Sequence, residues 1–368
     1  MKKRIFLIAL ILAILAGLFT SCNTGSHPAE NATVSEGPTT VTESSANRPD
    51  PAKDPEKTID LILVAGQSNA TGTTKVNAAA AYEILPELKQ TGYPSVLTAG
   101  VLRSTDMSFS EGYRRRNLDW QPTKLGLGKT ADYMGPEVGM AKELSMFYEG
   151  IGKTAGILKY GHGGTSLLND TSDSNQYGNW VPPSYAEKKG YAYEGATGGL
   201  YREFLQVVGE KLGSLKSLGY TDFNILGLYW MQGEQDRKNP NEYKEAFLCL
   251  VEDLRADLSE VVRSVTGGDD KGVTDLPIWV GTISRTFQSA SDSDQLFNKL
   301  FIRMQNGLAD AENKIFVVDH STFDINIQVN GRSEAVGSDN CHWNQIDHIR
   351  IGRNVGYAIL KYYHFIEE

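Results

Sequence analysis

The segment DLILVAGQSNATG, Asp60–Gly72, indicates the class of fold most directly. Its first half is an almost uninterrupted apolar run, which ends abruptly at Gly66. Such a run is typical of a strand that is buried on both faces of a parallel sheet. Ser68 follows directly, so it could be a nucleophile. Alternatively, Ser68 or Asn69 could be the cap of the helix that comes next.

Apolar runs and helical patterns alternate through the rest of the chain. Strands are expected at Ile59–Ala65, Thr154–Lys159, Asn224–Trp230, Pro277–Ile283 and Ile315–Asp319. Helices are expected at Pro136–Tyr148, Gly199–Leu218, Asn241–Val265, Ser293–Ala309 and Asn344–Tyr363. This order predicts a three-layer α/β/α sandwich with a central, mostly parallel, five-stranded sheet. The aperiodic stretches 100–129 and 169–193 are expected to be functional loops.

The N-terminal residues have the composition of a targeting segment. Lys2, Lys3 and Arg4 precede a short apolar run, the layout of a secretory signal. LFTSC, residues 18–22, resembles a bacterial lipobox, although Phe19 stands where that pattern usually has Leu. We therefore expect a lipoprotein signal peptide over 1–22 that ends in lipidation at Cys22. The alternative is ordinary secretion with cleavage nearby.

Residues 23–57 contain almost no large apolar side chains, so they are expected to form a flexible, disordered tether. A single folded domain would then span 58–368. These boundaries predict an exported bacterial lipoprotein that is anchored to a membrane and faces the periplasm or the cell surface.

Composition narrows the classes of partner. The net charge of −9 and the pI of about 5.3 exclude a basic nucleic-acid-binding surface, and we expect membrane contact only through the N-terminal lipid. The six histidines show no metal-ligand spacing, so no metal site is expected. Cys249 and Cys341 could pair, but Cys249 lies in an amphipathic helical pattern and is expected to be a small buried residue.

Polar or titratable residues follow four of the expected strands. In open parallel sheets, ligands bind beyond the carboxyl ends of the strands. The segments that follow these ends are GQSN (66–69), YGHGGTSL (160–167), MQGEQD (231–236) and, some distance after the last strand, SDNCHW (338–343). Four such segments at one edge of the sheet predict a site there.

These segments contain the residue types that a serine nucleophile needs for catalysis. Ser68 could be the nucleophile and His342 its base, with Asp339 orienting the imidazole from three residues earlier. The oxyanion donors could be the Ser68 amide, an amide of the Gly163–Gly164 turn and the side chain of Gln232. Each residue also has a structural interpretation. The turn could be only a turn, Asp339 could cap the last helix, and His342 could lie on the surface of its first turn.

Two better-known motifs are not matched. GQSNA has Ala70 where the GxSxG elbow requires a second glycine. TKLGLGKT has Thr123 where a phosphate-binding loop requires its first glycine, and it follows no clear strand.

Taken together, five blocks of the sequence resemble the SGNH-hydrolase superfamily, and within it the sialate O-acetylesterase-like branch of carbohydrate esterases. The blocks are GQSNATG (66–72), GPEVGMAKEL (135–144), KYGHGGTSL (159–167), LYWMQGEQD (228–236) and DNCHW (339–343). The resemblance implies a flavodoxin-like α/β/α fold, no cofactor, the triad Ser68, His342 and Asp339, and an oxyanion hole made by Ser68, the Gly163–Gly164 turn and Gln232. Supporting roles fall to Asn69 and to Glu234, which would brace Gln232 or its loop.

The substrate that the resemblance implies is an acetylated oligo- or polysaccharide, of the acetylxylan or sialic acid type. Tyr113, Trp120, Tyr177 and Trp180, in the two expected loops, suit sugar rings. Two alternatives remain open: an esterase or lipase of the same superfamily acting on non-carbohydrate esters, and a catalytically silent carbohydrate-binding lipoprotein.

Overall fold

The central feature of the fold is a seven-stranded sheet with the order β4-β3-β6-β1-β7-β8-β9. The computed structural model describes residues 55–103, 115–170, 178–288, 291–323, 328–329, 332–333 and 341–367. The strands of the sheet are β1 (Thr58–Gly66), β3 (Tyr93–Arg103), β4 (Arg115–Thr123), β6 (Ala155–His162), β7 (Asp222–Met231), β8 (Ile278–Gly281) and β9 (Ile315–Val318). All five expected strands are present and parallel to their neighbours, but the expected number of five was too low.

The two additional strands are β3 and β4, which extend the sheet on the β6 side. β3 runs parallel to β6, whereas β4 runs antiparallel to β3 at the edge. The stretch 100–129 is therefore not a continuous loop. The sequence of β4, RRNLDWQPT, is mostly polar because only one partner covers this edge strand, and such a strand lacks the apolar signal of a buried one. The stretch 169–193 likewise contains a helix, α6 (Pro183–Lys189).

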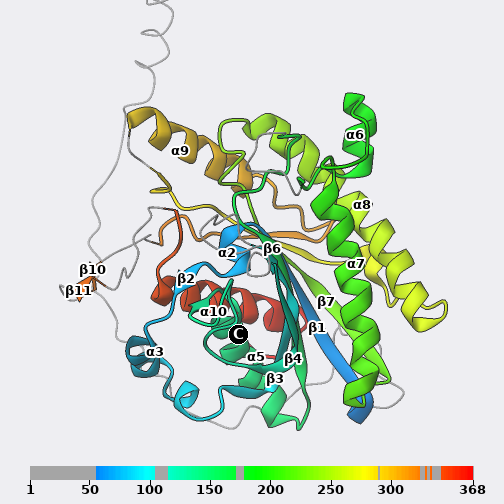
Figure 1. Ribbon diagram of the computed structural model, residues 1–368, viewed down its shortest axis with the longest axis vertical. Coiled ribbons are helices and arrows are strands. Elements are labelled where there is room, and N and C mark those ends of the chain that lie inside the picture. The colour runs from blue at the N-terminus through cyan, green and yellow to red at the C-terminus, as the bar shows by residue number, and fades with distance from the viewer. Residues whose placement is uncertain are drawn as a thin grey trace, which may run out of the picture. The chain divides into compact units, whose positions relative to one another are not determined.

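Helices cover both faces of the sheet, as expected. On one side lie α5 (Glu137–Gly150) and α10 (Gln345–Tyr362), and on the other α7 (Gly199–Ser214) and α8 (Pro240–Thr266) (Figure 1). Successive residues of β1 point to opposite faces, because side chains alternate along a strand. Leu61 and Leu63 pack in the core shared with α7, α8 and α9 (Asp292–Asn306), whereas Ile62 and Val64 pack in the core shared with α5, α10 and α3 (Ala78–Ile84).

The remaining described elements are short. They are η1 (Pro55–Lys57), α2 (Ser68–Thr71), η2 (Pro86–Lys89), η4 (Leu215–Leu218), η5 (Val273–Asp275) and the paired strands β2 (Thr74–Lys75) with β5 (Tyr133–Met134) and β10 (Gln328–Val329) with β11 (Arg332–Ser333). Within the described ranges, no helix is both long enough and apolar enough to cross a membrane. No disulfide joins Cys249 to Cys341.

The topology places a ligand site at the end of β1. The parallel strands β6-β1-β7-β8-β9 follow the 2-1-3-4-5 order of flavodoxin-like folds, in which the chain changes direction of winding at the first strand. The ends of the three central strands are level, because Gly66 of β1 pairs with Gly161 of β6 and Met231 of β7. The segments that follow these strands must therefore begin side by side.

Candidate active site

Ser68 lies where β1 ends against β7. Gly66 has a φ of +146°, a conformation that favours glycine, and a Cβ at this position would lie 2.1 Å from the Met231 carbonyl oxygen. The next residue, Gln67, donates its N–H to that same oxygen at 3.1 Å. Ser68 then begins the four-residue helix α2 and is 8% exposed. The sharp turn at Gly66 therefore brings Ser68 directly beside the segment that follows β7.

The helix-cap interpretation of this segment is wrong for both residues. The N-cap position belongs to Gln67, whose side chain makes no capping hydrogen bond, and Ser68 and Asn69 lie inside the helix. The Asn69 side chain is used in tertiary contacts instead. Its Nδ2 donates to Glu234 Oε1 at 2.7 Å, and its Oδ1 accepts from the Trp343 N–H at 3.3 Å. Asn69 thus joins the start of α2 to the segments that contain Gln232 and His342.

His342 lies immediately before the last helix and is half-buried. The N-cap of α10 is Asn344, whose side-chain oxygen accepts from the Asp347 N–H at 2.9 Å, so His342 is not in the first helical turn. Trp343 is tied to α2 through Asn69 and to β2 through the Thr74 hydroxyl, which donates to the Trp343 carbonyl oxygen. Asp339, the expected orienting carboxylate, lies outside the described residues, and its role stays a prediction.

Two backbone N–H groups are available as oxyanion donors. The Ser68 N–H, at the first position of α2, has no acceptor within its helix. After β6, the Gly163 N–H donates to the Arg103 carbonyl oxygen at 3.3 Å, whereas for the Gly164 N–H no hydrogen bond to any described residue is found. Gly164 has a φ of +69°. Of the two expected glycines, the geometry favours Gly164.

The Gln232 amide is held by neighbouring acceptors. Its Nε2 lies 2.6 Å from Asp236 Oδ2, 3.1 Å from the Thr165 carbonyl oxygen and 3.4 Å from Gln67 Oε1. Through these bonds the amide links the segments that follow β1, β6 and β7. The role expected for Gln232, that of an oxyanion donor, stays a prediction.

Asp236 is a centre of this network that sequence reasoning did not assign. It accepts hydrogen bonds from the Ser166 hydroxyl, from the N–H groups of Leu167 and Leu168, and from Gln232. Burial raises the pKa of Asp236, against the opposing effect of these donors. In the sequence, Asp236 is visible only as the last residue of the block MQGEQD. A single carboxylate in a turn has no characteristic spacing from which its role could be predicted.

Glu234 braces α2 rather than Gln232. One of its carboxylate oxygens accepts from Asn69, and the other has no hydrogen-bond partner among the described residues. Burial raises the pKa of Glu234, while hydrogen bonding and the nearby positive charge of protonated His342 act in the opposite direction.

Of the two expected sugar-facing tryptophans, Trp180 belongs to the core and Trp120 is half-buried against it. Trp180 is 1% exposed, donates its Nε1–H to Thr165 Oγ1 at 3.2 Å and packs edge-on against Trp230. Trp120 packs against the same apolar core and donates to the Lys211 carbonyl oxygen at 3.1 Å. Tyr113 and Tyr177 lie outside the described residues.

His162 ends β6 and is fully buried. Burial, helped by the positive charge of Arg103, lowers the pKa of His162 to about 3, so its imidazole is neutral at neutral pH. In the described part of the chain, no group of three or more His, Cys, Asp or Glu side chains is placed to hold a metal ion.

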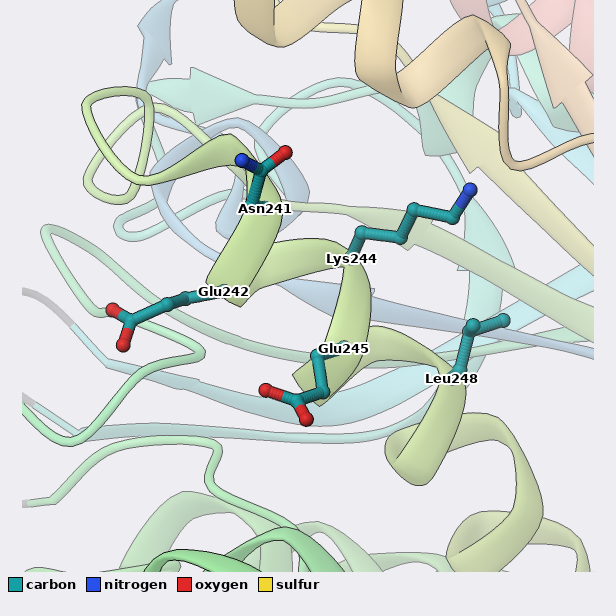
Figure 2. A pocket seen from close by; sticks show the side chains of 5 residues that line it. All are labelled: Asn241, Glu242, Lys244, Glu245 and Leu248. Carbon is teal, nitrogen blue, oxygen red and sulfur yellow. The ribbon is translucent and has the colours of Figure 1, made fainter.

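A separate hollow lies on the surface of α8 and does not include the site. Figure 2 shows the side chains that line it, which all come from the first turns of this helix: Asn241, Glu242, Lys244, Glu245 and Leu248. Glu245 is paired there with Lys188 and Lys189 of α6. The residues that line this hollow occupy ordinary solvent-facing positions of α8, and we assign them no catalytic role.

Comparison with family models identifies the family of the chain, and comparison with solved structures finds distant similarities. A family model described as carbohydrate esterase, sialic acid-specific acetylesterase, matches residues 58–361. The crystal structure of NanS aligns over 85% of this chain and 99% of its own, with a TM-score of 0.49 and 16% identity. A protein from Arabidopsis thaliana aligns over 84% and 99% (TM-score 0.44, 16% identity), and a carbohydrate acetylesterase from Xanthomonas citri over 81% and 56% (TM-score 0.43, 16% identity). No curated protein matches the chain.

Proposed function

Because this chain belongs to the sialic acid-specific acetylesterase family of carbohydrate esterases, and is thus a carboxylic ester hydrolase, we propose that it removes O-acetyl groups from carbohydrates by a Ser-His-Asp acyl-enzyme mechanism. One observation carries the proposal. Asn69, next to Ser68, is bonded both to Glu234 and to Trp343, next to His342. These bonds join the segments that follow β1 and β7 to the segment before α10, which supports placing Ser68 and His342 in one site.

In the proposed reaction, Ser68 Oγ attacks the acetyl carbonyl carbon while His342 takes the hydroxyl proton. The N–H groups of Ser68 and Gly164 donate to the oxyanion that forms. His342 then returns the proton to the departing sugar hydroxyl, which leaves an acetyl-Ser68 ester. Water, deprotonated by His342, attacks the carbonyl carbon of this ester, and His342 gives the proton to the departing Ser68 Oγ as acetate is released.

Two carboxylates are candidates for stabilising the imidazolium of His342. Asp339 is proposed from its spacing, and Glu234 from its bond to Asn69, which also accepts from the N–H of Trp343, next to His342. Substitution separates them. If Asp339 orients the ring, Asp339→Asn lowers kcat by a factor on the order of 10⁴ and Glu234→Gln by much less. The reverse order would transfer that role to Glu234.

The substrate class is tested with the protein and its Ser68→Ala variant. Both are incubated with acetylated xylan, O-acetylated sialic acid and a long-chain ester, and the released acid is measured. Acetate release from either sugar that disappears in Ser68→Ala supports the proposal. Release from the long-chain ester alone supports a lipase-type enzyme, and sugar binding without turnover supports a silent binding protein.

We also propose that the enzyme is an exported, membrane-anchored lipoprotein. The support is the sequence of residues 1–22, with its charged start, apolar run and terminal Cys22. Expression with a radiolabelled fatty acid tests this proposal. Label is expected in the wild type and not in Cys22→Ala, and an unlabelled wild type would contradict lipidation.

A further inference from the structure

A buried ion pair lies beside the helix that carries Ser68. Lys159 of β6 and Glu137, the first residue of α5, both have fully buried side chains, with 2.6 Å between Nζ and Oε2. Removing two charges from water costs so much that a buried ion pair is weak evidence for stabilisation. Stabilisation of the fold therefore does not by itself explain why the chain has this ion pair. The steps of ester hydrolysis proposed above do not involve Lys159 or Glu137.

The ammonium of Lys159 is bonded to α2. Besides Glu137, it donates to the carbonyl oxygens of Leu127, at 3.1 Å, and of Thr71, at 3.3 Å. An ammonium has three hydrogens, so its donors are all used. Thr71 is the last residue of α2, and its carbonyl is among those that a helix leaves without an intrahelical donor. Lys159 thus supplies the donor at the end of the helix opposite to Ser68.

Glu137 holds the segment that packs against the same end of α2. Its two carboxylate oxygens accept from the Gly135 N–H at 3.0 and 3.1 Å. A Cβ on Gly135 would lie 2.9 Å from the Gly72 Cα and 3.3 Å from the Asn69 carbonyl oxygen, so this backbone touches α2 directly. The pair therefore connects β6, α5 and the loop around Leu127 to the end of one short helix.

The position of α2 depends on its contacts with Lys159 and Gly135, because a helix of four residues is not stable by itself. Only two backbone hydrogen bonds close it, Thr71 N–H to Gln67 O at 2.9 Å and Gly72 N–H to Ser68 O at 3.0 Å. Isolated helices of this length are not stable in water. We propose that Lys159, held by Glu137, is a positioning residue that fixes α2 and so aims Ser68 Oγ at its base and substrate.

This proposal rests on Ser68 being the nucleophile, and the test uses two readouts of that serine. The first is the rate constant for labelling by a fluorophosphonate, which needs no knowledge of the natural substrate. The second is kcat and KM with 4-nitrophenyl acetate. Lys159→Met should lower the labelling rate and kcat by about a hundredfold, with little change in KM, because an ångström of misplacement has an effect of that size. Its Tm should also fall, because Glu137 becomes a buried, unpaired charge.

A double variant separates positioning from stability. In Lys159→Met/Glu137→Gln the buried charge is gone, and the amide oxygen of Gln can still accept from Gly135. The Tm should recover, while labelling stays slow because Thr71 and Leu127 still lack their donor. Lys211→Met is the matched control: this lysine of α7 is also largely buried but pairs with Asp119, at 3.1 Å, away from α2. Its labelling rate should equal that of the wild type.

Two results would overturn the proposal while leaving Ser68 as nucleophile. One is labelling of Lys159→Met at the wild-type rate, and the other is recovery of labelling in parallel with Tm in the double variant. A wild-type protein that is neither labelled at Ser68 nor active on the acetyl ester would overturn the proposed function and this inference together.

Discussion

The substitution Gly66→Ala tests the turn that brings Ser68 to the end of β7. The new Cβ would lie 2.1 Å from the Met231 carbonyl oxygen and 2.6 Å from its carbon, and ordinary contact begins at 3.4 Å. Backbone must therefore move by more than about an ångström. Strain at a φ of +146° costs about 1–3 kcal/mol, and overpacking costs a similar amount. We expect the free energy of unfolding to fall by about 4 kcal/mol.

The same movement should lower activity in the protein that remains folded. It breaks or lengthens the hydrogen bond from Gln67 to Met231 and shifts Ser68, and a shift of this size can reduce kcat by about a hundredfold. Urea unfolding gives the stability, and acetate release measured at low temperature, where the variant is folded, gives kcat.

A second glycine supplies the control. Gly213 lies in α7, and a Cβ added there would meet no described atom within 4 Å. Gly213→Ala should therefore leave activity unchanged and stabilise the helix by up to about 1 kcal/mol. If Gly66→Ala lost less than about 1 kcal/mol and kept its kcat, the close approach of β1 and β7 would not constrain Ser68, and our account of the turn would be refuted.

Three further expectations concern buried polar groups near the strand ends. Burial lowers the pKa of His320 to about 3. Below pH 6.5 the imidazole is therefore protonated in the unfolded chain but stays neutral in the folded chain. The free energy of unfolding decreases as the pH is lowered through this range. Between pH 6 and 5, urea titrations should show the wild type losing about 1 kcal/mol more than His320→Asn, and equal losses would contradict this. Gln232→Ala should lower Tm, because buried Asp236 and the Thr165 carbonyl oxygen lose a donor, and it should also lower kcat of the folded protein by about 10²–10³ if Gln232 is an oxyanion donor. Trp180→Phe should lower the unfolding free energy by about 1–3 kcal/mol, through lost packing and the bond to Thr165, without raising KM for an acetylated sugar. A raised KM would instead indicate that Trp180 contacts the sugar.

The elements predicted most accurately are those whose burial is uniform. β1, β6 and β7 are covered on both faces, and their apolar runs identify them without tertiary information. β4 has a single partner and most of its residues are exposed or half-buried, so its polar sequence resembles that of a loop. The expected sugar contact of Trp180 was wrong for a related reason. Aromatic residues suit a sugar ring and a protein core equally, and only packing showed that Trp180 faces the core.

The fold class, the membership of an esterase family and the segments that gather at the strand ends could all be predicted from the order of residues, because apolar runs and turn residues are local signals. The use of the polar groups there became visible only in three dimensions. Asn69 lies between Glu234 and Trp343, Gly164 differs from Gly163 as an available donor, and Lys159 is joined to Thr71. Hydrogen bonds between residues far apart in the chain depend on distance and direction, which no local pattern of residue types contains.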